Sequence, residues 1–318
     1  MKKYSIPALL LALLLVCVSC APLTGGDETT KADVTTDDVT TAEVTTEEIT
    51  TEEVTTEEVT TEELTTEALT TEEQTPTVSS KYLSLGDSIA NGYGLTDQAN
   101  TRYSALLAKK LGIDDVHSAA LDGQTSSELL AHLETNSYSG NELITVSIGA
   151  NNILRPATDA LMGLLLSPEN ALANLYSPEF NAKLQAGVAQ FGEDLPKIVD
   201  ALQESNPGAK IVLLSIYNPF KGGKVPLTIN GGLTEVDLGA MTANYVNLLN
   251  AIVASVAQQK GCIVADVYTA FESSSEQNVN VVLDANGYIS FTAFDPHPNA
   301  PGHILIAEVI EAALSKAE

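Results

Sequence analysis

The sequence predicts an α/β domain over residues 80–318, in which a parallel sheet of about five strands lies between two layers of helices. Five short runs rich in branched apolar residues alternate along the chain with helical stretches. These runs are apolar almost throughout, which is typical of strands covered on both faces. Because right-handed crossovers place helices on both faces of a parallel sheet, the alternation predicts a three-layer α/β/α sandwich.

Each element follows from a local pattern. The predicted strands are residues 81–85, 115–121, 142–149, 210–218 and 262–268. Between them, "RYSALLAKKLG" ends on Gly112, "TSSELLAHLE" begins with a capping box from Thr125 to Glu128, and "YVNLLNAIVASVAQQKG" ends on Gly261. A capping box marks the start of a helix, and a glycine commonly follows its end.

Two segments allow more than one interpretation. The stretch from Leu154 to Leu195 is longer than a crossover requires and contains the apolar cluster "ALMGLLLSPENALANLY". A second helix packed on the sheet is the simpler interpretation, because apolar stripes usually face a core. The alternative is a lid over the binding edge of the sheet. Residues Val279 to Phe291 predict a surface hairpin around Asn286-Gly287.

The amino terminus predicts an export signal over residues 1–19. Two lysines precede a run of about thirteen apolar residues, which is too short for a comfortable membrane span. Its end, "VCVSC", resembles the lipobox of bacterial lipoproteins, which implies lipidation of Cys20 as the first mature residue. That pattern prefers leucine where this chain has Cys17, so ordinary cleavage and secretion stays open.

Residues 20–79 predict a disordered, extended spacer. An apolar residue, two threonines and mostly acidic residues recur every five positions from Val34 to Glu73, which fits neither the helix nor the strand period. Residues 23–79 carry 17 carboxylates against one lysine, so the segment repels itself and has little apolar surface to bury. Fully stretched, those 57 residues reach at most about 190 Å.

Charge and cysteine content exclude several function classes. The net charge is −27, and the part after the spacer is acidic as well, so no basic surface for nucleic acid is expected. Cys262 is the single cysteine of the predicted domain, which excludes a disulfide framework and a thiolate metal site there. Neither a metal nor an organic cofactor is expected.

Four polar or glycine positions follow predicted strands and indicate a site at one edge of the sheet. In "YLSLGDSIANG" the first strand ends at Leu85, and Ser88 follows after a sharp turn at Gly86. Parallel sheets bind ligands at the carboxyl ends of their strands. The other positions, each after a later strand, are Gly123 in "LDGQTSSEL", Asn151 in "SIGANNIL" and His297 in "FDPHPNAPGH".

With these blocks in this order, residues 81 to about 314 resemble the SGNH hydrolases, also called the GDSL esterase family. The resemblance implies a flavodoxin-like α/β/α fold in which Ser88 attacks an ester carbonyl and His297 removes its proton. It also implies an oxyanion hole formed by the backbone amides of Ser88 and Gly123 and the side-chain amide of Asn151. A serine hydroxyl does require such a base, and a developing oxyanion requires fixed donors.

The sequence departs from the family pattern at two positions. The usual Asp-x-x-His spacing is replaced by Asp295-Pro296-His297, with Phe294 at the position where the family has aspartate. Asp295 is the preferred partner of His297, and the Phe294 carbonyl is the alternative. Asn152 stands where the family usually has a structural aspartate.

Two further polar residues near these blocks have structural interpretations. Asp87 at the turn before Ser88 is expected to bond local amides rather than take part in catalysis. His303 lies in a predicted helix that Asn299 and Pro301 begin, and it is expected to cap or pack there.

The leading hypothesis is an exported serine esterase or acylhydrolase that acts on acetylated carbohydrate, lysophospholipid or a small ester. It would be held at the outer face of the cell membrane by Cys20 or be secreted. The first alternative is a non-catalytic surface binding module on the same fold. A flavin or phosphate binder is disfavoured, because "GDSIANGYG" matches neither the dinucleotide nor the phosphate-loop pattern. Oligomeric state does not follow from the sequence.

Overall fold

The computed structural model describes residues 81–157, 175, 177–229, 232–290 and 295–317. The predicted export signal, Cys20 and the spacer lie outside the described residues. So do Phe294 and most of the apolar cluster between Leu154 and Leu195.

The main sheet has five parallel strands in the order β2-β1-β3-β4-β7. The strands are β1 (Lys81–Gly86), β2 (Asp115–Ser118), β3 (Leu143–Ser147), β4 (Lys210–Leu214) and β7 (Ile263–Ala265). The predicted five-stranded parallel sheet is confirmed, although several strands end earlier than their apolar runs. The residues between the observed and the predicted ends form loops at the carboxyl edge of the sheet.

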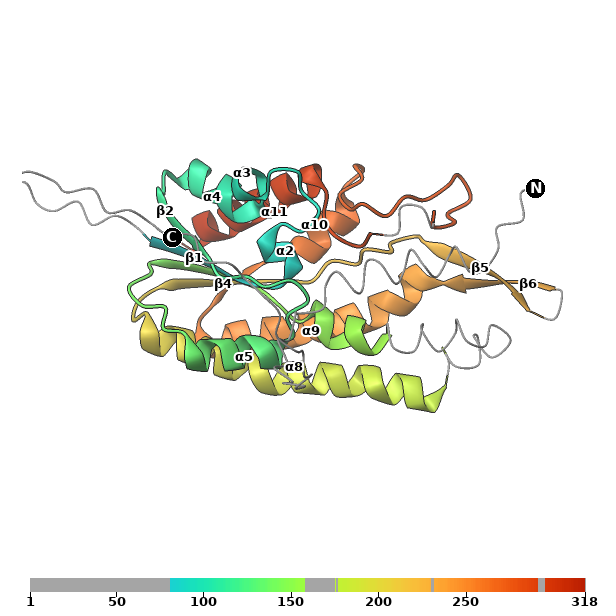
Figure 1. The fold of residues 1–318 in the computed structure, drawn as a ribbon, viewed down its shortest axis with the longest axis horizontal. Helices are drawn as coiled ribbons and strands as arrows, with labels where there is room; N and C mark the ends of the chain where they lie inside the picture. Colours follow the sequence, from blue (N-terminus) through green and yellow to red (C-terminus); the bar gives the residue numbers. More distant parts are fainter. Residues whose placement is uncertain (1–80, 158–174, 176, 230–231, 291–294, 318) are drawn as a thin grey trace, which may run out of the picture. The chain divides into compact units, whose positions relative to one another are not determined.

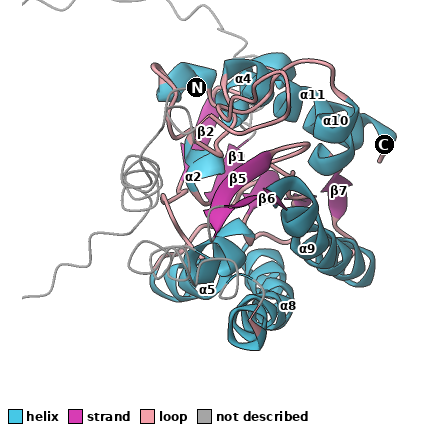
Figure 2. Cartoon of the chain, turned by 90° about the vertical axis from the view of Figure 1, so that its right-hand side faces the viewer, coloured by secondary structure: helices cyan, strands magenta, loops and turns pink. Residues whose placement is uncertain are grey.

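Helices cover both faces of this sheet, which confirms the three-layer prediction (Figures 1 and 2). One face carries α4 (Tyr103–Leu111), α10 (Val267–Ser273) and α11 (Ala300–Lys316). The opposite face carries α5 (Ser126–Thr135), α8 (Pro178–Ser205) and α9 (Leu238–Lys260). Two short helices, α2 (Ser88–Asn91) and α3 (Gln98–Thr101), follow β1.

Two large apolar clusters of the described residues cover the sheet, one on each face. Along β1, Leu83 and Leu85 join the cluster of α5, α8 and α9, whereas Tyr82 joins the cluster of α4, α10 and α11. Successive side chains of a strand point to opposite faces, so a strand buried on both faces supplies both clusters. This two-sided burial fixes the register and therefore the positions of the loops at the carboxyl edge.

The helix interpretation holds for the described end of the segment from Leu154 to Leu195. Ser177 caps α8 by accepting a hydrogen bond from Phe180 N at 3.1 Å, and Pro178 occupies the first helical turn. Phe191 and Leu195 are buried against the sheet. Around Phe191 and Leu195 the segment therefore packs on the sheet, and residues 158–174 and 176 lie outside the described residues.

Among the described residues, α9 has the length and mean hydropathy of a membrane-spanning helix. Its apolar residues Val246, Leu249, Val253 and Val256 are buried in the cluster that covers the sheet. Packing in the core therefore accounts for these four residues, whereas Leu248 of the same helix is exposed.

The sequence interpretation missed one hairpin. β5 (Lys224–Ile229) pairs antiparallel with β6 (Gly232–Asp237), and in Figure 1 this hairpin lies beyond the carboxyl ends of the main strands. The predicted turn around Asn286-Gly287 is present. Leu283 and Ile289 form an antiparallel bridge across it, and Gly287 N donates to Asp284 O at 3.0 Å.

Candidate active site

Ser88 is placed by a turn that only glycine allows. Gly86 ends β1 with φ 136°, and a Cβ atom there would lie 1.9 Å from the Ser147 carbonyl oxygen of β3. The chain turns, Asp87 caps α2 by accepting from Ile89 N at 3.0 Å, and Ser88 becomes the first residue of that helix. The buried Ser88 side chain thus lies at the carboxyl edge of the sheet.

Ser88, His297 and Asp295 form a continuous chain of polar contacts. His297 Nε2 lies 2.9 Å from Ser88 Oγ, and its Nδ1 lies 2.6 Å from Asp295 Oδ1. Because a carboxylate can only accept, the proton of a neutral imidazole resides on Nδ1, and Nε2 is free to accept from the serine hydroxyl. The three residues proposed from the sequence are therefore in contact.

Asp295 is held as an acceptor by several donors. Besides the imidazole, His297 N donates to Oδ1 at 3.1 Å, and Asn280 Nδ2 donates to Oδ2 at 2.9 Å. Burial alone would raise the pKa of Asp295, but its hydrogen bonds with His297 and Asn280 hold it below its usual value. The carboxylate therefore stays ionised beside the ring.

Three residues that support this arrangement were not found from the sequence. The Tyr93 ring lies 4.5 Å from the imidazole, centroid to centroid. Tyr217 donates its hydroxyl to Pro296 O at 2.8 Å, and Asn280 N donates to His297 O at 3.0 Å. No motif marks these residues, because each reaches His297 from a segment distant in sequence.

Gly123 and Asn151 follow the two strands that flank β1, so both lie at the same edge as Ser88. Gly123 has φ 72°, and Asn151 Nδ2 donates to Gln124 O at 3.1 Å. Asn91, at the end of α2, donates to Asp122 Oδ1 at 2.9 Å. This bond ties the helix that carries Ser88 to the loop that carries Gly123.

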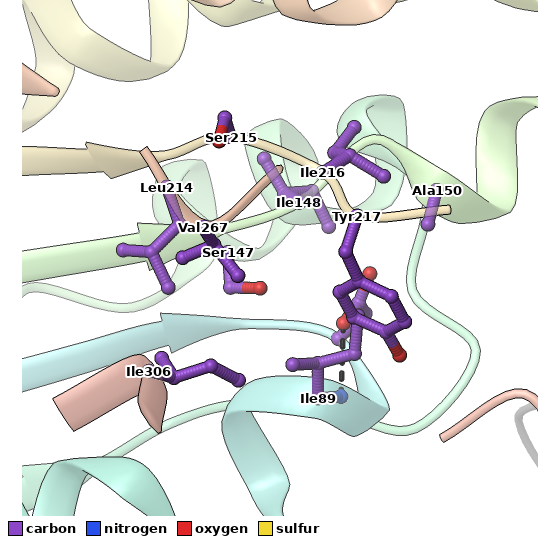
Figure 3. Close-up of a pocket in the computed structure, with 11 residues that line it drawn as sticks. Ile89, Ser147, Ile148, Ala150, Leu214, Ser215, Ile216, Tyr217, Val267 and Ile306 are labelled. Carbon is purple, nitrogen blue, oxygen red and sulfur yellow. Dashed lines mark hydrogen bonds between the residues drawn. The ribbon is translucent and has the colours of Figure 1, made fainter. Parts of the chain in front are cut away.

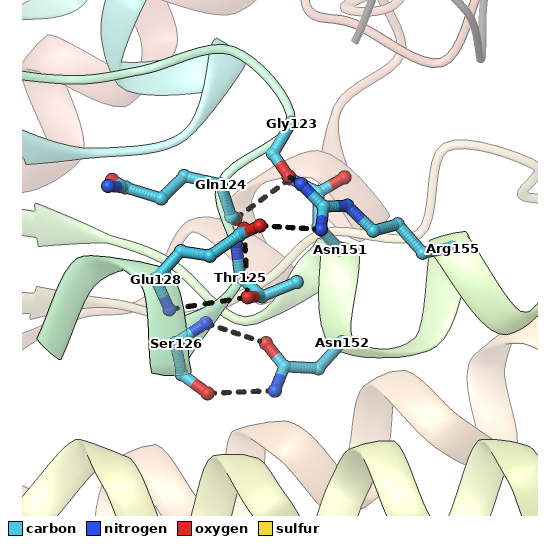
Figure 4. Close-up of polar contacts among 8 residues, drawn as sticks. All are labelled: Gly123, Gln124, Thr125, Ser126, Glu128, Asn151, Asn152 and Arg155. Atoms are coloured by element: carbon cyan, nitrogen blue, oxygen red, sulfur yellow. Dashed lines mark hydrogen bonds and ion pairs between the residues drawn. The ribbon is translucent and has the colours of Figure 1, made fainter. Parts of the chain in front are cut away.

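Arg155, which follows β3, also hydrogen-bonds the loop that carries Gly123 (Figure 4). It donates through one nitrogen to Gly123 O at 2.6 Å and through another to Glu128 Oε1 at 2.8 Å. Glu128 completes the predicted capping box with Thr125. The loop between β2 and α5 is thus hydrogen-bonded to α2 through Asn91 and to the segment after β3 through Arg155.

Asp87 has the local role expected of it. Its Oδ2 atom has no hydrogen-bond partner among the described residues, and burial raises its pKa to about 7. It borders a cavity of about 10 Å³ whose walls include Ser147, Leu214 and Tyr217 (Figure 3). This cavity is too small for a substrate group, since it approaches the size of one water molecule.

Two further reactive side chains among the described residues, His303 and Cys262, are poorly suited to catalysis. His303 accepts from Tyr103 N at 3.2 Å inside the core, and burial lowers its pKa to about 4, which confirms its packing role. Burial raises the pKa of Cys262 to about 11, so its thiol is a poor nucleophile. In the described part of the chain, no cluster of three metal-ligating side chains occurs.

A larger hollow of about 610 Å³ lies between the amino-terminal parts of α8 and α9. Its walls include Leu175, Phe180, Met241 and Tyr245. None of its described lining residues belongs to the constellation around Ser88.

Comparison with known proteins identifies the family of the chain. The model of the GDSL-like lipase/acylhydrolase family matches residues 84–305, which is more than half of the chain. The chain therefore belongs to the GDSL-like lipase/acylhydrolase family, a family of ester hydrolases.

Two curated relatives match more than half of this chain. A lipase from Streptomyces rimosus is 27% identical over 205 residues, which cover 61% of this chain and 72% of that protein. The uncharacterized protein YpmR from Bacillus subtilis is 21% identical over 251 residues, which cover 73% of this chain and 80% of that protein.

Two solved structures share the fold. The extracellular lipase from Streptomyces rimosus has a TM-score of 0.54 at 23% identity, and phospholipase A1 from Streptomyces albidoflavus has 0.55 at 21%. Each match covers 74% of this chain and 99% of the other.

Proposed function

We propose that this protein hydrolyses carboxylic esters with Ser88 as nucleophile, His297 as general base and Asp295 as the group that orients the imidazole. The observation that carries the proposal is the chain Ser88–His297–Asp295, with contacts of 2.9 and 2.6 Å. Family membership supports the same reaction class.

The proposed reaction proceeds in two halves. Ser88 Oγ bonds to the ester carbonyl carbon while its proton passes to His297 Nε2, and the resulting imidazolium gives that proton to the departing alkoxide. The acyl-enzyme is then attacked by water, which loses its proton to the same nitrogen. The serine–acyl bond breaks, Ser88 regains the proton, and a carboxylic acid leaves.

The backbone amides of Ser88 and Gly123, with the Asn151 side-chain amide, are the proposed oxyanion donors. A fixed donor of this kind is worth about 3 kcal/mol of transition-state stabilisation. Asn151 suits this role because a neutral amide adds no charge near His297.

Export and lipid attachment through Cys20 remain part of the proposal. Lysophospholipid, acetylated carbohydrate and small esters are the candidate substrates, and the acidic charge disfavours anionic polymers. Two similar proteins are a lipase and a phospholipase A1, which makes lipid esters the first class to test.

Replacement of the nucleophile tests the proposal. The full chain and Ser88→Ala are assayed with p-nitrophenyl esters of increasing acyl length, and kcat should fall by at least about 10³-fold in the variant. Ser315→Ala is the matched control, because Ser315 is exposed near the end of α11. Equal rates for wild type and Ser88→Ala would contradict the proposal. Ester binding without turnover by the wild type would favour the binding-module alternative.

A further inference from the structure

A second chain of buried polar side chains lies behind the proposed site. Asn152 Oδ1 accepts from Ser126 N at 3.0 Å, and Asn152 Nδ2 donates to Ser126 Oγ at 2.7 Å (Figure 4). Ser126 Oγ in turn donates to Asp194 Oδ2 at 2.8 Å. All three residues are buried, with Asp194 only 3% exposed.

The direction of this chain is fixed by one backbone group. The Ser126 amide can only donate, so the oxygen of Asn152 must face it and the nitrogen of Asn152 must face Ser126 Oγ. The single hydroxyl proton of Ser126 then points to Asp194. Asp194 accepts two more hydrogen bonds, from Ser127 Oγ at 2.6 Å and from Gln190 Nε2 at 2.9 Å. A buried carboxylate needs such donors to offset its lost hydration.

The chain joins the two segments that carry the proposed oxyanion donors. Ser126 begins α5, directly after the loop with Gly123 and Gln124. Asn152 follows Asn151, which donates to Gln124 O. On the far side, α8 approaches so closely that a Cβ atom at Gly187 would lie 1.9 Å from Asn152 O. Asp194 therefore anchors both segments to a long, packed helix.

We infer that Asp194 is a positioning residue for the oxyanion donors, because it is the acceptor that receives the Ser126 hydroxyl proton and so fixes the chain from Asn152 through Ser126. The inference rests on the proposed function. Asn152 occurs where the resembled family usually has aspartate. In this chain an aspartate there would place a second acceptor against Ser126 Oγ, which has one proton to give.

This arrangement predicts that a substitution at position 194 restores the activity and stability that a substitution at position 152 removes. In Asn152→Asp, two carboxylates compete for the Ser126 hydroxyl proton, and one is left buried without it. In the double variant Asn152→Asp/Asp194→Asn, the hydroxyl donates to position 152 and accepts from the new amide at position 194. Asp194→Asn alone should change kcat and Tm only slightly. The new amide oxygen can still accept from Ser126 Oγ, and the Gln190 amide can turn so that its oxygen accepts from the new amide nitrogen.

The test compares the full chain with these variants and with Asp194→Ala, measuring kcat and KM for a short ester and Tm. Asn152→Asp and Asp194→Ala should each lower kcat by about tenfold or more and leave KM within about twofold of wild type. Oxyanion donors stabilise the transition state rather than the bound substrate, so their displacement lowers kcat. The double variant should return to within about threefold of wild type. Asp200→Ala, an exposed carboxylate of the same helix paired with Lys260, should leave both constants unchanged.

Two results would overturn the inference. One is a double variant no better than Asn152→Asp alone in kcat and Tm. The other is a normal kcat in folded Asp194→Ala despite a lower Tm, which would leave Asp194 a purely structural role. If the wild type hydrolyses no ester, the proposed function fails by itself. The Tm values of the two single variants and the double variant then still decide whether residues 152 and 194 are coupled.

Discussion

At the scale of single residues, the compact Asp295-Pro296-His297 spacing has a local explanation. Asp295 Oδ1 accepts both the backbone amide of His297, at 3.1 Å, and its ring Nδ1, at 2.6 Å. An aspartate that bonds the amide two residues later forms an Asx turn. This turn folds the carboxylate back onto the imidazole, so one intervening residue suffices. The sequence left the Phe294 carbonyl as the alternative, because spacing alone does not reveal such a turn.

The first residue-scale prediction concerns the orientation of His297. Asp295→Asn should lower kcat by at least about 100-fold, because an amide no longer holds the ring proton on Nδ1. Asn280→Ala, which removes one donor to Asp295, should cost less than about tenfold. The rates are measured with the same short ester. Wild-type activity in Asp295→Asn would instead support the backbone carbonyl.

The second residue-scale prediction concerns Asp87 and pH. Burial raises its pKa from 3.8 to about 7, so between these values the folded protein holds a proton that the unfolded chain has released. Its contribution to stability is therefore present below pH 3.8 and is lost as pH rises through 7. Asp87→Asn keeps a good helix cap without that charge. Tm is measured at pH 4, 6 and 8, and the Tm of the variant relative to wild type should be highest at about pH 8. A constant Tm difference would contradict this assignment.

At the scale of elements, local sequence signals predicted those helix ends that residues close in sequence determine. The capping box at Thr125 and the glycines after α4 and α9 fall where they were expected. The β5–β6 hairpin was missed although "PLTINGGLTE" carries an Asn-Gly turn signal between two alternating runs. The network of Asn152, Ser126 and Asp194 carries no such signal, since it joins α5 and α8 only through tertiary packing.

The element-scale prediction tests the close approach of α8 to Asn152. Gly187→Ala places a methyl group where the Asn152 carbonyl lies at 1.9 Å, so it should lower the free energy of unfolding by about 1–3 kcal/mol or more. Gly192→Ala is the matched control in the same helix. Its added atom meets the Ile252 side chain at 3.5 Å, and the gain in helix propensity should raise stability by up to about 1 kcal/mol. Urea unfolding measures both, and equal effects would contradict the packing argument.

At the scale of the whole molecule, topology explains why much of the site could be predicted. Ser88, Gly123 and Asn151 each follow one of three adjacent parallel strands, so their order in the sequence already places them at one edge. His297 precedes α11, and its position depends on Tyr93, Tyr217 and Asn280. Those contacts cross between segments without a repeating pattern, which is why the sequence predicted the residue but not its surroundings.

The whole-molecule prediction concerns the boundary at residue 80. All five strands of the main sheet and the contacts around Ser88 lie within residues 81–317. A chain of residues 80–318 should therefore match the full chain in Tm to within about 2 °C, well inside the shift expected from 1 kcal/mol, and have the same kcat for a soluble ester. A chain that begins at Asp87 is the control. It lacks β1, which pairs with both β2 and β3, and should show no cooperative unfolding. A marked loss of Tm in the 80–318 chain would mean that the acidic spacer contributes to the fold, because no other part of the sequence is removed with it except the export segment.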